Sequence, residues 1–308
     1  MNESRNALLA LTLLALAAAS AARAGDPAGA PTPEELAGAT YTGIEETAIT
    51  LTDGAWEGAP YDEGSASRPM VRLTGAGDFL LAGDLDGDGA EEAVVHLVED
   101  GGGTGRFGYL VVMARGANGL VQKGIAELGA RVVVRGGRIA EGGIVLDVIQ
   151  GGPGDAACCP GQLATRTFTL ADGVLDEVAS EVTGAVSAAL LEGREWVLRG
   201  FDEDDPAPAE PEATIVFEGG RLGGSNGCNR YNAGFETGEL PTQITIGPVM
   251  ATRRACEPAA TELEQRFDRA LAGVDSWSLS FDRLTLLYKD GEEWRRMSFV
   301  GRELPGQE

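Results

Sequence analysis

The segment EPAATELEQRFDRALAGV, residues 257–274, decides the fold class, because it has clear helical periodicity in a chain otherwise built of short β-type runs. Its apolar residues recur at intervals of three and four positions, which predicts one buried face on a helix. Pro258 suits the first helical turn, and Gly273 supplies a C-terminal stop. The apolar stripe is formed by Leu263, Phe267, Ala270 and Leu271. We therefore expect one main helix on an antiparallel sheet, an α+β arrangement.

Short apolar runs alternate with turn signals from Tyr41 onward. Runs such as EEAVVHLVED and GGIVLDVIQGG are rich in β-branched residues and are bounded by DG, GG and ADG turns, the pattern of strands joined by hairpins. We expect about eight or nine strands in an antiparallel β domain over residues 38–182. A linker over 183–193 then leads to the α+β domain over 194–301, in which the acidic, Pro-rich loop 202–213 is expected to be mobile. The chain is thus predicted to be mainly β.

The first residues predict export. MNESRNALLALTLLALAAASAARAG combines a basic residue, an apolar run and a small-residue box, which predicts a signal peptide over residues 1–24 with cleavage near Ala24. Residues 25–37 are expected to form a disordered leader. No other apolar run approaches the ~20 residues of a transmembrane helix, so we expect a periplasmic or secreted protein without a transmembrane segment. The net charge of −24 disfavours nucleic acid as a partner.

An acidic loop in the first domain has the spacing of a calcium site. In GDLDGDGAEEAVV three aspartates alternate with other residues before a glycine, so that three carboxylates and a backbone carbonyl can surround one ion. The candidate ligands are Asp84, Asp86, Asp88, the carbonyl of Ala90, and Glu92. Val95 stands where an EF-hand requires Glu, so the loop is not an EF-hand. The alternative is an Asp-Gly hairpin turn without metal.

The motif GGPGDAACCPG places Cys158 next to Cys159. Neighbouring Cα atoms lie about 3.8 Å apart, below the usual minimum for a disulfide, so the two can bond to each other only as a strained vicinal bridge. Otherwise they stay reduced or pair elsewhere. The arrangement matches no zinc-binding pattern.

The stretch SNGCNRYNAGF, residues 225–235, predicts a tight turn around Cys228. Asn226 and Asn229 tolerate left-handed backbone conformations, and Gly227 lets the chain fold back. A disulfide between Cys228 and Cys256 is favoured in an exported chain. The alternative, a reactive Cys228, would need a positive neighbour to lower the pKa of the thiol, such as a nearby arginine.

The single histidine, His96, lies in the run AVVHLV. We expect it to face outward from a strand rather than to act in catalysis, because no nucleophile signature accompanies it. The sequence contains no Gly-x-Ser-x-Gly motif and no phosphate-binding loop. It therefore predicts a protein that is not an enzyme.

Both parts of the chain resemble known modules. Residues 41–175 resemble a recurring module of secreted bacterial proteins, through the FG-GAP-type loop DLDGDG and the CCP motif in DAACCPG. Residues 190–300 resemble the META domain (HslJ-like) family, through REWVL, the GCNRY turn and a downstream Ala-Cys. Arg254 stands where that family usually has methionine, a departure that bears on the packing of the turn.

The META resemblance implies a compact, mostly antiparallel fold without established catalytic residues, in envelope proteins linked to heat shock and drug tolerance. We therefore expect a stress-related binding scaffold whose partner is an envelope protein, a peptide or a lipid-like ligand, with Ca²⁺ as the candidate cofactor. One alternative is an inhibitor of an envelope protease or lysozyme-like hydrolase, because a rigid loop binds at low entropic cost. A second alternative is a thiol-redox protein that uses Cys158 and Cys159.

Overall fold

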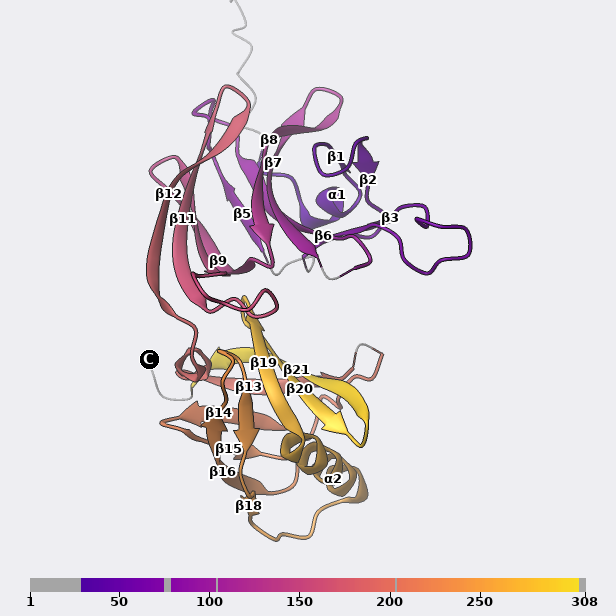
Figure 1. The fold of residues 1–308 in the computed structure, drawn as a ribbon, viewed down its shortest axis with the longest axis vertical. Helices are drawn as coiled ribbons and strands as arrows, with labels where there is room; N and C mark the ends of the chain where they lie inside the picture. Colours follow the sequence, from indigo (N-terminus) through magenta and orange to yellow (C-terminus); the bar gives the residue numbers. More distant parts are fainter. Residues whose placement is uncertain (1–28, 75–78, 104, 203, 305–308) are drawn as a thin grey trace, which may run out of the picture.

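The computed structural model describes residues 29–74, 79–103, 105–202 and 204–304. They form two domains that follow one another along the long axis of the molecule (Figure 1). Both domains are built of antiparallel sheets, and the long helix belongs to the second. The predicted mainly β fold, with an α+β second domain, is confirmed. The predicted signal peptide lies outside the described residues.

The N-terminal domain contains a sandwich of two sheets. The first comprises β3 (Ala55–Glu57), β4 (Met70–Leu73), β5 (Leu80–Gly83), β6 (Glu92–Asp100), β7 (Arg106–Gly116) and β8 (Gly119–Ala130). The second comprises β9 (Val133–Ala140), β10 (Gly143–Gln150), β11 (Gln162–Ala171) and β12 (Val174–Ala185). Their orders are β3-β4-β6-β7-β8, with β5 also on β6, and β12-β11-β10-β9. Apolar side chains such as Val94, Leu110, Ile144 and Phe168 fill the space between them.

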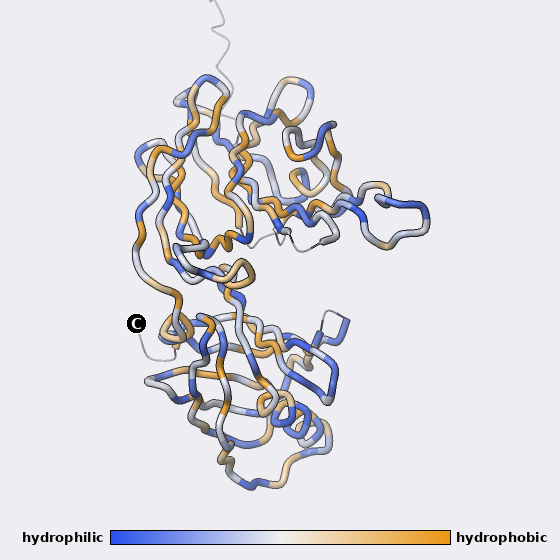
Figure 2. The backbone as a smooth tube through the Cα atoms, in the orientation of Figure 1, coloured by the Kyte–Doolittle hydropathy of each residue, from blue (hydrophilic) through white to orange (hydrophobic). Residues whose placement is uncertain are grey.

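A third layer covers the opposite face of the first sheet. It consists of helix α1 (Pro33–Ala37) and the pair β1 (Thr40–Tyr41) and β2 (Ile49–Thr50). These elements place Leu36, Tyr41 and Ile49 against the buried residues of β6 and β7. Strand β6 is therefore covered on both faces, and its first six residues are all buried. Figure 2 shows the apolar colouring along the strands, whereas the loop between β3 and β4 is hydrophilic and extends away from the domain.

Residues 33–37, expected to belong to a disordered leader, form α1 instead. A capping box begins this helix. The Glu35 N–H donates to Thr32 Oγ1 at 3.3 Å, and the Thr32 N–H donates to Glu35 Oε2 at 2.8 Å. Leu36 is 1% exposed, and Arg115 of β7 donates to the carboxylate of Glu35. This ion pair lowers the pKa of Glu35 to about 2. The segment is thus attached to the sheet by one buried side chain and one ion pair.

We expect the substitution Thr32→Ala to lower the free energy of unfolding by about 1 kcal/mol, the usual cost of removing a helix N-cap. Urea denaturation of the mature chain measures this change. Thr47→Ala is the matched control, because Thr47 is exposed and lies outside the helix. Equal stabilities for the two variants would contradict a structural role for α1.

The second domain is one strongly curved antiparallel sheet. It follows the 3-10 helix η1 (Ala188–Leu191) and comprises β13 (Arg194–Phe201), β14 (Thr214–Glu218), β15 (Arg221–Ser225), β16 (Arg230–Thr237), β17 (Ile244–Ile246), β18 (Met250–Ala251), β19 (Val274–Ser280), β20 (Arg283–Asp290) and β21 (Glu293–Glu303). The order is β17-β16-β15-β14-β13-β21-β20-β19, with β18 on β16. Its two ends approach each other, because the Trp277 N–H donates to the Thr242 carbonyl at 3.0 Å and Gln243 bridges to Ser276.

Helix α2 (Pro258–Ala272) closes this domain, with Gly273 at its C-terminal cap, as predicted. The predicted apolar stripe is buried, and it packs in the same core as Trp196 and Phe299. Within the described part of the chain, no helix combines the length and the apolar character needed to cross a bilayer.

The two domains pack against each other. Phe281 of the second domain stacks on Phe79 of the first, with ring centroids 5.5 Å apart. Ile149 at the end of β10 and Val186 after β12 belong to the core of the second domain. Strand β19 also contacts β9. The position of the second domain is therefore fixed by side chains of the first.

Candidate functional site

The acidic loop between β5 and β6 brings three of the five predicted calcium ligands together. Ligand oxygens of Asp84, Asp86 and Asp88 all lie within 4.8 Å of one another, and the three residues are exposed. Asp84 shapes the loop, because its carboxylate accepts from the N–H groups of Gly87 at 2.7 Å and Gly89 at 3.1 Å. Both glycines have positive φ angles, 77° and 89°, which residues with a Cβ rarely adopt.

The other two predicted ligands are placed differently. Glu92 is fully buried at the start of β6 and lies outside the group of three. Its Oε2 accepts from the Leu85 N–H at 2.8 Å, whereas its Oε1 has no hydrogen-bond partner among the residues that the structure describes. Burial raises the pKa of this carboxyl. Ala90 donates its N–H to Asp88 Oδ1 at 2.8 Å.

A basic side chain from another strand already contacts the acidic loop. Lys123 of β8 donates to Asp86 Oδ2 at 2.9 Å, and this contact lowers the pKa of Asp86 and raises the pKa of Lys123. The lysine is 37 positions away in sequence, so the local motif gave no signal for it. Any cation at the three aspartates must compete with this ammonium group.

In the second domain the structure pairs Cys228 with Cys256 as a disulfide, with Cα atoms 5.9 Å apart. Cys228 is buried. The turn between β15 and β16 reverses at Gly227, whose φ angle is +95°. A Cβ at this position would lie 2.6 Å from Leu263 of α2, so glycine is required for the turn to approach the helix.

The two asparagines of this turn have a different role from the one expected. Neither has a positive φ angle; both are buried, and they use their amide groups as cross-links. Asn226 Nδ2 donates to Asp268 Oδ1 at 3.1 Å, and Asn229 Nδ2 donates to Glu264 Oε1 at 2.8 Å. The asparagines are therefore hydrogen-bonding residues that fix the turn to α2.

Arg254, the departure from the META pattern, supports the same turn. Its guanidinium donates to the Cys228 carbonyl at 2.9 Å, and its backbone N–H donates to Asn229 Oδ1 at 2.8 Å. An arginine thus holds this turn through polar contacts. Sequence reasoning did not identify Glu264 and Asp268 as members of the network, because helical periodicity marks only the apolar face of α2.

The structure pairs Cys158 with Cys159 in the loop between β10 and β11. Asp155 closes this loop, because its Oδ2 accepts from the N–H groups of Gly152 and Gly161, both at 2.7 Å. These two bonds lower the pKa of Asp155. The loop faces the second domain, where Pro241 lies close to Gly161.

His96 is buried, with an exposed fraction of 4%, and the expectation that it faces outward is wrong. The expectation treated its strand as half-exposed, but β6 is central in its sheet and covered on both faces. Thr74 Oγ1 lies 3.2 Å from His96 Nδ1, and Nε2 has no partner among the described residues. Burial lowers the pKa of the imidazole to about 4, so the side chain is neutral at pH 7.

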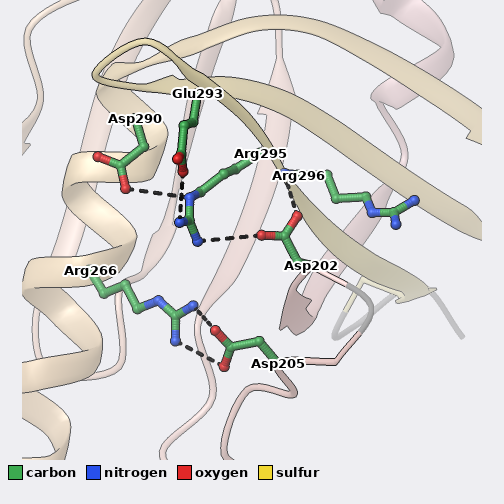
Figure 3. Close-up of polar contacts among 7 residues, drawn as sticks. All are labelled: Asp202, Asp205, Arg266, Asp290, Glu293, Arg295 and Arg296. Atoms are coloured by element: carbon green, nitrogen blue, oxygen red, sulfur yellow. Dashed lines mark hydrogen bonds and ion pairs between the residues drawn. The ribbon is translucent and has the colours of Figure 1, made fainter.

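The acidic loop after β13 is attached to the rest of the domain at its start, and its expected mobility stays a prediction. Asp205 forms a paired contact with Arg266 of α2, and Asp202 accepts from the Arg296 N–H at 3.3 Å (Figure 3). Arg295 Nη1 lies 3.6 Å from Asp202 Oδ2 and also pairs with acidic side chains at the β20–β21 turn. The charges of Asp202 and Asp205 are thus compensated by arginines of the same domain.

Comparisons with known proteins found a family model and a solved structure that are each similar to part of the chain. A solved structure, described as the NMR structure of a protein from Burkholderia xenovorans, is 24% identical over 37% of this chain and 87% of that chain, with a TM-score of 0.31. No curated protein matches the chain. The FG-GAP-type resemblance of the first domain stays a prediction. The family model described as META domain matches residues 189–300, and this segment of the chain therefore matches the family that its GCNRY turn and Ala-Cys motif predicted.

Proposed function

We propose that the chain is a non-enzymatic binding scaffold of the cell envelope, exported by its N-terminal segment and linked to stress through its META domain. The observation that carries this proposal is the bonding state of the cysteines and the burial of the histidine. All four cysteines are in disulfides, and the single histidine is buried beside a threonine. The cysteines and the histidine are thus engaged in the scaffold. A disulfide-braced sheet with fixed turns is suited to binding, because little entropy is lost when a rigid surface meets its partner.

Thermal unfolding of the purified mature chain tests this proposal. Three classes of probe are added separately: an extended apolar peptide, a lysophospholipid below its micellar concentration, and a panel of small neutral aromatic molecules. A rise in Tm with at least one class supports a binding scaffold. The same preparation is assayed against casein, a chromogenic ester and reduced insulin, and turnover of any of these substrates would contradict it. Stoichiometric inhibition of a protease or lysozyme would instead favour the inhibitor alternative.

We also propose that the loop from Asp84 to Asp88 binds Ca²⁺ and stiffens the first domain. Three carboxylates within 4.8 Å of one another offer the oxygen ligands that this ion prefers. Binding requires Lys123 to leave Asp86, so the ion replaces an internal cation. The buried Glu92, with one oxygen lacking a partner, is near enough for the charges of Asp86 and Asp88 to raise its pKa. A cation at the aspartates would relieve this repulsion.

Addition of 5 mM Ca²⁺ is expected to raise the Tm of the mature chain by several degrees, in proportion to ln(1 + [L]/Kd). Asp86→Ala should erase the rise, because it removes the central carboxylate. Lys123→Met should enlarge it, because the competing ammonium group is gone. Asp176→Asn on the exposed strand β12 is the control with the same loss of charge. An unchanged Tm in both the native chain and Lys123→Met would contradict the calcium site.

A further inference from the structure

A cavity of about 410 Å³ lies between the two domains. Strands β6, β7 and β9 of the first domain border one side of it, and β19 of the second domain borders the other. The loop that carries Cys158 and Cys159 borders it as well. Its volume falls in the range of about 300–1,000 Å³ that is usual for small-molecule sites, which often lie at domain interfaces.

The first polar group at this cavity is His96. Thr74 Oγ1 lies 3.0 Å from the His96 carbonyl and 3.2 Å from His96 Nδ1, and its hydroxyl has one hydrogen to donate. We assign that hydrogen to the carbonyl, the nearer acceptor, so that Nδ1 carries the ring proton and Nε2 is a hydrogen-bond acceptor. Nε2 has no partner among the described residues. It lies next to Gly108, where an added Cβ would be 2.9 Å from it.

The second polar group is Trp277 of β19, on the opposite side of the cavity. Its side chain is 3% exposed, and its Nε1–H, which can only donate, also has no partner among the described residues. Buried polar atoms without partners cost free energy, and such exceptions need an explanation. His96 and Trp277 line the same cavity from different domains. Both nitrogens are buried in this structure, so a ligand reaches them only when the rings turn toward the cavity.

The remaining lining is suited to an aromatic ring. Phe107, Val133 and Leu279 supply apolar surface, and the disulfide of Cys158 and Cys159 adds polarisable sulfur, which makes favourable contacts with aromatic rings. None of the described residues that border the cavity is acidic, which disfavours a cationic ligand. Two arginines also stand at the border: Arg106 pairs with Asp100 at 3.1 Å, and Arg131 likewise has a partner.

We propose that this interdomain cavity binds a small, uncharged aromatic molecule that carries a hydroxyl group. The hydroxyl donates to His96 Nε2 and accepts from Trp277 Nε1–H, so that one ligand oxygen satisfies both buried nitrogens. The aromatic ring lies among the apolar side chains and the vicinal disulfide. This inference rests on the proposed binding function and names its site and ligand class. The site requires both domains, because each domain supplies one of the two polar groups.

The test uses 2-naphthol as the probe and the full mature chain as the protein. Isothermal titration calorimetry is expected to give one site with a Kd of about 100 μM, a moderate affinity for a fragment of this size. In the ¹⁵N–¹H spectrum the indole resonance of Trp277, assigned with Trp277→Phe, should shift on titration. The resonance of Trp294, which is half exposed on β21, should stay in place. 2-Methoxynaphthalene keeps the ring and the oxygen but has no O–H, so it should bind about fivefold to tenfold more weakly.

The variants separate the contributions of the two domains. Trp277→Phe removes the donor and keeps most of the ring, and it is expected to weaken 2-naphthol binding about fivefold to tenfold. Trp294→Phe is the matched control and should leave the Kd unchanged. An indole resonance of Trp277 that stays fixed up to 1 mM 2-naphthol would overturn the proposal, as would equal affinity for 2-methoxynaphthalene. In either case, a rise in Tm with the peptide or the lysophospholipid would still support the proposed binding function, but at a site other than this cavity.

Discussion

The double variant Cys228→Ala, Cys256→Ala is expected to lose about 3.5 kcal/mol of unfolding free energy. The disulfide closes a segment with a sequence separation of 28, and in the chain-entropy model a loop of that size restricts the unfolded chain by about this amount. The native state is also expected to lose stability, because the disulfide fixes the turn that Asn226 and Asn229 attach to α2. Guanidinium denaturation of the oxidised mature chain measures it.

The vicinal pair provides the control for this experiment. Cys158→Ala, Cys159→Ala removes a disulfide between adjacent residues, which restricts the unfolded chain very little, so we expect a change below about 1 kcal/mol. Similar losses for the two double variants would show that loop closure is not the cause. Alkylation of the native protein without reduction completes the test: rapid labelling of Cys228 would identify a free, reactive thiol and would contradict a structural disulfide.

Local patterns predicted the features that depend on neighbouring residues. The spacing of Leu263 and Phe267 predicts one buried helix face without any knowledge of the elements that pack on it. The helix begins and ends within two residues of the predicted segment. Alternating apolar runs likewise predicted strands and an antiparallel arrangement. Helix α1 was missed because five residues are too few to show a periodicity, and part of its stability comes from Arg115, a residue of strand β7.

The errors at the candidate sites have one physical cause, which is contact between residues far apart in sequence. Lys123 reaches Asp86 from β8, and Glu264 reaches Asn229 from α2; neither pair has a local signature. His96 was expected to be exposed because its strand was assumed to have one open face. Whether a strand is covered on one face or two depends on the elements packed above and below it, and these are set by the tertiary fold.

His96 is expected to make the protein lose stability in mildly acidic solution. Burial lowers its pKa to about 4 in the folded state, whereas the value in the unfolded chain is near 6.5. The unfolded state therefore binds the proton first, so the stabilisation is complete above pH ~6.5 and is lost as the pH falls through about 4. Between pH 7 and pH 4.5 the histidine should remove roughly 2 to 3 kcal/mol of unfolding free energy. Urea denaturation at the two pH values measures this loss.

The variant His96→Leu isolates this contribution. Its own cost in packing and in the lost Thr74 bond is present at both pH values and cancels when the two are subtracted. The difference between pH 7 and pH 4.5 should therefore be smaller in His96→Leu than in the native chain by roughly 2 to 3 kcal/mol. Glu35 interferes little, because its stabilisation is lost as the pH falls from its ordinary pKa of 4.5 toward its lowered value of about 2, and this loss is the same in both proteins. Burial raises the pKa values of Glu92 and Asp268, so these carboxyls favour folding as the pH falls, and they do so equally in both proteins. An identical pH dependence in the two proteins would contradict the lowered pKa of His96 in the folded state.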